Sequence, residues 1–125
     1  MEDESKPAYD LEDRLLNFGA RIIVLTRSLT RDYAKRHIGN QLLRSGTAPL
    51  SHHGEAQAAE SPADFIHKLR LALKELRETE RWLKLIERAN IIPKVEKLSP
   101  ILNETDQLIR IFVSSISTAE KRRTS

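Results

Sequence analysis

Four histidines and the carboxylates near them are the side chains with the greatest potential for chemistry. His52 and His53 are adjacent, so on a helix their rings point about 100° apart and do not converge on one metal ion. Glu55 follows His52 by three residues, a spacing that predicts a side-chain pair on a helix. No pair of histidines has the spacing of the zinc helix motif. The pattern therefore predicts structural or solvent-exposed histidines.

Paired acid–base catalysis needs two carboxylates that face one another, and the sequence does not supply them. Glu55 and Glu60 are five residues apart and do not share one face of a helix, which favours solvation or salt bridges. The sequence has no Ser-His-Asp arrangement and no Gly-rich phosphate loop. It also has no cysteine, which excludes disulfides, thiolate chemistry and cysteine-based zinc sites. We expect no enzyme activity, no cofactor and no metal.

Composition points to one domain built from long helices. The chain has 125 residues, and its 31% of charged residues is typical of helices with solvated faces. The net charge of +3 permits, but does not require, an acidic partner such as nucleic acid. No apolar run approaches the 18 or so residues of a membrane span, and the acidic N-terminus does not resemble a secretory signal. We expect a cytoplasmic protein without a membrane partner.

Positive charge is concentrated between residues 14 and 36. This stretch contains six Lys or Arg residues and a single acid, Asp32. They could form a basic stripe down the first helix and around the turn after it, and such a stripe can contact phosphates. The alternative is a solvated helix face, or ion pairs with a neighbouring subunit. With two Tyr and one Trp, a base-stacking surface is poorly supported. The candidate nucleic-acid-binding residues are Arg14, Arg21, Arg27, Arg31, Lys35 and Arg36.

The stretch 61–89 organises the fold, because it predicts one uninterrupted helix. Ser61 is a good N-cap, with proline directly after it. Leu69, Leu76 and Leu83 recur every seven residues within an apolar band that is wide enough to face a bundle core. Similar stripes predict a first helix from near Asp10 and a last helix from near residues 93–94.

The second segment is the least regular. Gly46 and Pro49 disfavour a helix interior, which predicts a loop over 45–54. The alternative is a kinked helix over 33–58, in which small residues let a neighbouring helix approach closely.

Four amphipathic segments with short connections predict an all-α fold, an antiparallel up-down-up-down four-helix bundle. We expect the bundle over 9–118, a flexible N-terminal tail over 1–8 and a basic flexible C-terminal tail over 119–125. The third helix also carries apolar residues off its main stripe. Because a bundle needs one apolar face per helix, this surplus predicts a self-association interface at Leu71, Trp82 and Leu85.

Three stretches resemble one bacterial family of four-helix bundles, the 23S rRNA intervening-sequence or S23-type proteins. They are YDLEDRLLNFGARII (9–23), QLLRSGTAPLSHHGEAQAAES (41–61) and DFIHKLRLALKELRETERWLKLI (64–86). The similarity covers roughly residues 9 to 117. In that family the second segment is helical despite its proline or glycine, so the resemblance favours the kinked helix. Many members carry Asn and an aromatic or aliphatic residue where this chain has His52 and His53, so the chain departs from the family pattern at these two positions.

Members of this family resemble the accessory variability protein of diversity-generating retroelements, a homopentameric barrel associated with nucleic-acid binding. The resemblance implies a homo-oligomer, with five subunits favoured, RNA or DNA as a ligand, and a reverse transcriptase as a further partner. It supplies no catalytic residues. The alternative function is a structural or protein-interaction bundle without a nucleic-acid ligand.

Overall fold

The structure is a computed structural model that describes residues 7–124, with side chains from residue 11 onward. It contains α1 (Pro7–Thr26), α2 (Tyr33–Gln57), α3 (Pro62–Ala89), a short 3-10 turn η1 (Val95–Lys97) and α4 (Leu98–Thr124). The prediction of an all-helical protein with four long helices is confirmed for this part of the chain. Residues 1–6 of the expected N-terminal tail lie outside it. None of these helices is both long and apolar enough to span a membrane.

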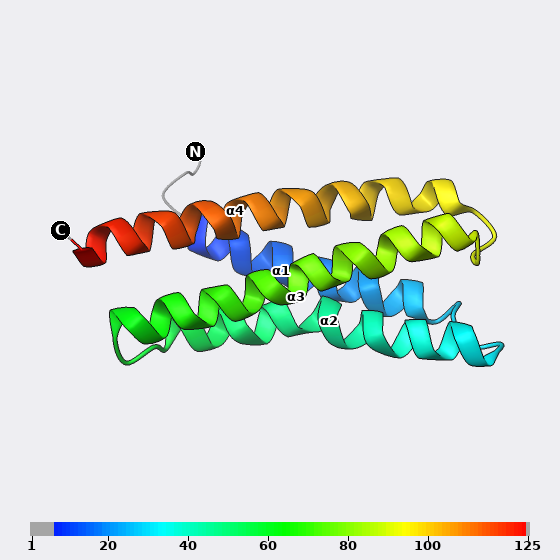
Figure 1. Ribbon diagram of the computed structural model, residues 1–125, viewed down its shortest axis with the longest axis horizontal. Coiled ribbons are helices and arrows are strands. Elements are labelled where there is room, and N and C mark those ends of the chain that lie inside the picture. Colours follow the sequence, from blue (N-terminus) through cyan, green and yellow to red (C-terminus); the bar gives the residue numbers. More distant parts are fainter. Residues whose placement is uncertain (1–6, 125) are drawn as a thin grey trace.

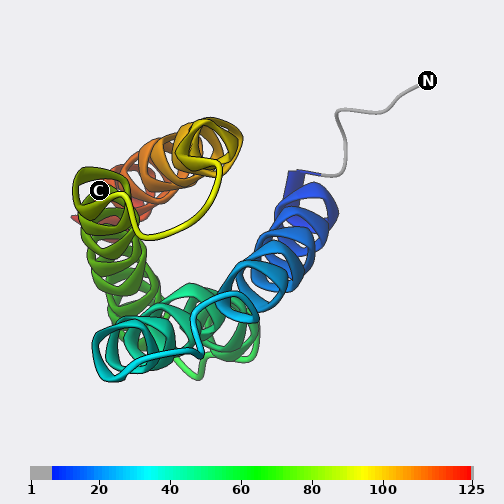
Figure 2. The same ribbon diagram turned by 90° about the vertical axis from the view of Figure 1, so that its right-hand side faces the viewer.

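The four helices lie side by side along one long axis, and consecutive helices run in opposite directions (Figure 1). Packing is closest between α2 and α3, followed by α3 with α4 and α1 with α2, whereas α1 and α4 pack least closely of the neighbouring helices. The end-on view places α1 and α3 on opposite sides of the bundle (Figure 2). The outward faces of α1 and α3 are therefore separate surfaces.

The core is a single cluster contributed by all four helices. The stripe predicted on α3 is buried, since Leu76 and Leu83 are fully covered and Leu69 is 3% exposed. The two largest fully buried side chains are Phe18 of α1 and Phe112 of α4, which come from the neighbouring helices that pack least closely. Other buried members are Leu15, Ile22, Leu42, Ala72, Ile86, Ile101 and Leu108.

Local capping sets the helix ends as the sequence predicts. Ser61 caps α3 by accepting a hydrogen bond from Asp64 N at 3.0 Å, and Asp32 caps α2 by accepting one from Lys35 N at 2.9 Å. Asn90 ends α3 in the left-handed region with φ of 55°, a conformation that asparagine tolerates. These caps fix where the connecting turns begin.

Helix α2 is continuous through Gly46 and Pro49, so the loop interpretation of 45–54 is wrong and the helix interpretation is right. Tertiary contacts outweigh the local preferences. Gly46 lies against Ile22 of α1, and Thr79 Oγ1 of α3 donates a hydrogen bond to the buried Ser45 Oγ at 2.9 Å. Small buried residues on α2 therefore allow α1 and α3 to approach it closely.

The last helix extends further than expected. Residues 119–124, predicted as part of a flexible tail, continue α4 to Thr124. Ala119 packs against the core, and Glu120 forms an ion pair with Arg70 of α3. The sequence hid this extension because the segment carries few large apolar side chains. Its start also differs, since α4 begins at Leu98 and places Pro100 in its first turn, where proline is tolerated.

Two alanine substitutions on α2 are expected to have opposite effects on stability. A Cβ at position 46 would lie 2.8 Å from two Ile22 atoms, and relieving such overpacking costs about 1–3 kcal/mol. Replacing a helical Gly by Ala gains only about 1 kcal/mol, so Gly46→Ala should destabilise the protein. A Cβ at Gly54 meets nothing within 4 Å, so Gly54→Ala should stabilise it. Urea unfolding of both variants tests this, and a stabilised Gly46→Ala would contradict the close packing.

Candidate nucleic-acid interface

The exposed face of α3 carries six cations spaced four, three, four, three and four residues apart. This spacing forms two interleaved rows with a seven-residue repeat, the same repeat as the buried leucines, so the cations stay on the outer face along the bundle. All six residues are exposed. At 1.5 Å per residue the row is roughly 27 Å long. We call it the α3 cation row: Arg70, Lys74, Arg77, Arg81, Lys84 and Arg88.

Three acidic residues of α3 lie beside this row and form ion pairs: Glu75, Glu78 and Glu80. Glu75 and Glu78 both bind Arg44 of α2, with Arg44 Nη1 3.0 Å from Glu75 Oε1. Glu80 lies 4.0 Å from Lys84. Arg70 and Lys84 are the two members of the row that form an ion pair within residues 11–124. The remaining four form none there: Lys74, Arg77, Arg81 and Arg88. The α3 cation row is thus a strip of predominantly positive charge on a protein whose net charge is only +3.

The cations predicted between 14 and 36 do not form one surface. Arg14 binds Glu104 Oε1 of α4 at 2.8 Å and Gln107 Oε1 at 3.1 Å, and so fastens α1 to α4. Arg21 is exposed on α1, and Arg27 is exposed in the turn directly after it. Arg31 and Arg36 are exposed around the α1–α2 turn, and Lys35 is half-buried.

The turn that carries part of this predicted set lies at the end of the bundle where α3 ends. The His37 ring packs edge-on against Trp82, with centroids 6.1 Å apart, which places the first turns of α2 beside the C-terminal half of α3. At the same end of the bundle, Lys94 and Lys97 of the α3–α4 turn line a cavity of about 340 Å³ with Val24 and Leu25 of α1. Both long turns therefore add positive charge near the end of the α3 cation row.

The predicted interface on α3 is less exposed than its composition suggests. Leu71 is half-buried, and Trp82 packs at the edge of the core while its Nε1 donates a hydrogen bond to Glu78 Oε2 at 3.0 Å. Leu85 is 43% exposed. Among the described residues, exposed large apolar side chains are more concentrated on α1, at Leu16, Ile23 and Val24.

Comparison with known proteins agrees with this architecture. Residues 11–114 match the family described as 23S rRNA-intervening sequence protein. The chain belongs to this family. It is similar to a crystal structure of a protein with unknown function from the S23 ribosomal protein family of Bacteroides thetaiotaomicron VPI-5482. The identity is 36% over 88% of this chain and 97% of that one, with a TM-score of 0.81. No curated protein matches the chain.

The two adjacent histidines of this 23S rRNA-intervening sequence protein have different environments. His52 Nδ1 lies 3.1 Å from Glu55 Oε1, as the spacing predicts. This hydrogen bond lowers the pKa of Glu55, and the positive charge of Lys68 lowers it further. His53 lies in the core, 2% exposed, edge-on to Phe112, and its Nδ1 has no hydrogen-bond partner. Within the described residues, no group of three or more His, Cys, Asp or Glu could hold a metal ion.

Burial lowers the pKa of His53 below 6.5, and the charge of Glu12 on α1 opposes this only partly. The unfolded chain therefore binds a proton more readily than the folded protein. The free energy of unfolding should be flat above about pH 7 and fall as the pH drops through about 6.5. Replacing His53 with Leu should remove this slope, whereas replacing the exposed His67 should not. Urea titrations between about pH 7.5 and 5.5 measure it, and an unchanged slope in His53→Leu would contradict the assignment.

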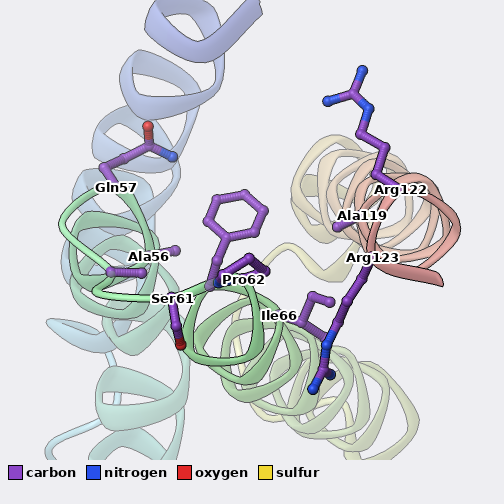
Figure 3. A pocket seen from close by; sticks show the side chains of 10 residues that line it. Ala56, Gln57, Ser61, Pro62, Ile66, Ala119, Arg122 and Arg123 are labelled. Carbon is purple, nitrogen blue, oxygen red and sulfur yellow. The ribbon is translucent and has the colours of Figure 1, made fainter. Parts of the chain in front are cut away.

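A cavity of about 450 Å³ lies between the α2–α3 turn and the end of α4, with walls that include Ala56, Pro62 and Ile66. Two arginines near the end of α4, Arg122 and Arg123, also line it. Figure 3 shows Arg122 and Arg123 extending in different directions from α4, with Arg123 running past Ile66. Because the two guanidinium groups diverge, they do not form a common anion site.

Proposed function

We propose that this protein is a non-enzymatic, self-associating nucleic-acid-binding protein of the 23S rRNA-intervening sequence family, built as an antiparallel up-down-up-down bundle. The ligand lies along the α3 cation row and is held by its phosphates. Membership of a family named for a 23S rRNA intervening sequence makes structured RNA the first ligand to test.

One observation carries this proposal, the straight α3 cation row. Its length of roughly 27 Å matches about eight nucleotide steps of 3.4 Å, so several cations can meet successive phosphates of one strand. No aromatic residue stands within the row, which favours backbone contact over base stacking. Arg31 and Arg36 are exposed around the α1–α2 turn, at the end of the bundle where α3 ends. Such contacts give little sequence preference.

Self-association would make modest contacts effective. A single row should bind with a Kd on the order of 10⁻⁴–10⁻⁶ M at physiological salt. Several rows on one rigid assembly act together, and avidity raises the affinity by about 10²-fold or more. The resemblance to the accessory variability protein makes five subunits the first stoichiometry to test.

Fluorescence anisotropy with labelled structured RNA and duplex DNA, repeated over a salt series, tests the proposal. Four to six phosphate contacts per copy should give a slope of about −4 to −5 in log K against log salt. Similar affinity for unrelated sequences is expected. If neither ligand binds at about 50 mM salt, a condition that favours phosphate contacts, nucleic-acid binding is excluded and a structural or protein-interaction role stands instead.

A further inference from the structure

The outward face of α1 is the most apolar surface among the described helices. Val24 is 60% exposed and Leu16 is 49% exposed, with the small exposed residue Ala20 midway between them. Figure 2 places this helix across the bundle from α3, so the outward faces of the two helices are separate surfaces. A partner on α1 would leave the cation row free.

The residues on this face are arranged symmetrically about Ala20. Asp13 precedes Ala20 by seven residues on α1, and Arg27, in the turn directly after α1, follows it by seven. Leu16 and Val24 stand four residues before and after the same point. On the N-terminal side of Ala20 the order is therefore an apolar residue, Leu16, and then an acid, Asp13. On the C-terminal side it is an apolar residue, Val24, and then a base, Arg27.

We propose that this face is a two-fold self-association surface, in which α1 of one copy packs antiparallel against α1 of a second copy. The axis passes through Ala20, so each Ala20 meets the Ala20 of the other copy. Leu16 then packs on Val24 of the second copy, and Asp13 pairs with Arg27. An isologous contact of this kind needs one surface that complements itself.

Charge complementarity favours a second copy over other occupants. Neither Asp13 nor Arg27 makes an ion pair within the described part of the chain, and both are exposed. In the antiparallel pair, Asp13 of each copy lies opposite Arg27 of the other. A parallel pair would instead place Asp13 opposite Asp13 and Arg27 opposite Arg27. An anionic membrane surface would be repelled by the acidic end. The small side chain at the crossing point also allows close approach of the two helices.

This inference rests on the self-association in the proposed function and names its surface. A two-fold contact closes upon itself, so alone it gives a dimer. A ring of five needs heterologous contacts on other faces, and the α1 contact would then join two rings.

The absence of cysteine permits a direct cross-linking test. Two helices packed 8–10 Å apart bring Cα atoms at the crossing point to roughly 4–6 Å, within reach of a disulfide. Ala20→Cys should therefore form a covalent dimer in oxidised glutathione. Asp13→Cys lies on the same face, but its two copies would be about 21 Å apart along the axis, so it should not cross-link with itself. A mixture of Asp13→Cys and Arg27→Cys should give a mixed dimer.

A charge exchange provides the second test. Asp13→Arg should weaken association in sedimentation experiments, because it meets Arg27 of the second copy. The double variant Asp13→Arg with Arg27→Asp should restore association, since only the direction of each pair is exchanged. A monomeric wild-type protein would overturn both this surface and self-association. An oligomeric protein without the Ala20→Cys cross-link would overturn this surface alone.

Discussion

Reversing three charges of the α3 cation row should weaken nucleic-acid binding on the order of 10²-fold or more at low salt. The variant replaces Lys74, Arg77 and Arg81 with Glu. Each lost phosphate contact removes about one unit from the salt slope, so the slope should fall by about three units. These side chains make no ion pair within residues 11–124, so the substitutions break none. Because the new glutamates lie beside Glu75, Glu78 and Glu80, circular dichroism should accompany the titration to check the helix content.

A matched control separates position from net charge. Replacing Arg21, Lys121 and Arg123 with Glu changes the net charge by the same amount, and these exposed residues also lack ion pairs in the described structure. Anisotropy titration at one salt concentration should show much weaker binding only for the α3 variant. Equal losses in both variants would assign binding to overall charge and would contradict the α3 site.

Replacing Leu76 with Ala should lower the free energy of unfolding by about 2–5 kcal/mol, the range for a fully buried leucine. Leu76 is fully buried at the middle of α3, where the deletion leaves a cavity among all four helices. Leu85→Ala, on the same helix but 43% exposed, should change stability by no more than about 0.5 kcal/mol. Urea unfolding measures both, and a similar small loss for both would contradict the core assignment.

Periodicity predicts the helices and the core well because the buried face repeats along each helix. Leu69, Leu76 and Leu83 show this on α3, and the caps at Asp32 and Ser61 mark helix starts. The conformation of α2 around Pro49 depends on contacts between helices, which propensity does not contain. Only the family resemblance favoured the correct alternative there.

The candidate surfaces were harder to predict. Dense cations draw attention to residues 14–36, yet Arg14 is engaged with α4. On α3, acids such as Glu75 and Glu78 alternate with the bases and conceal the row until contacts with α2 show which way each side chain faces. The four-three spacing was the available signal. The burial of His53 beside Phe112 depends on helix packing and left no distinct signal.

The placement of Trp82 gives the protein an intrinsic optical reporter. It is the single tryptophan of the chain, held between His37 of α2 and Glu78 of α3. Its emission should shift to longer wavelength when α2 separates from α3, because water then reaches the indole. It also adjoins Arg81 in the sequence, and its helix α3 lies across the bundle from α1 (Figure 2). Nucleobases that approach the α3 cation row should quench its intensity, whereas pairing of copies through α1 should leave the spectrum unchanged. Unlabelled protein can thus distinguish unfolding, ligand binding and self-association in one fluorimeter.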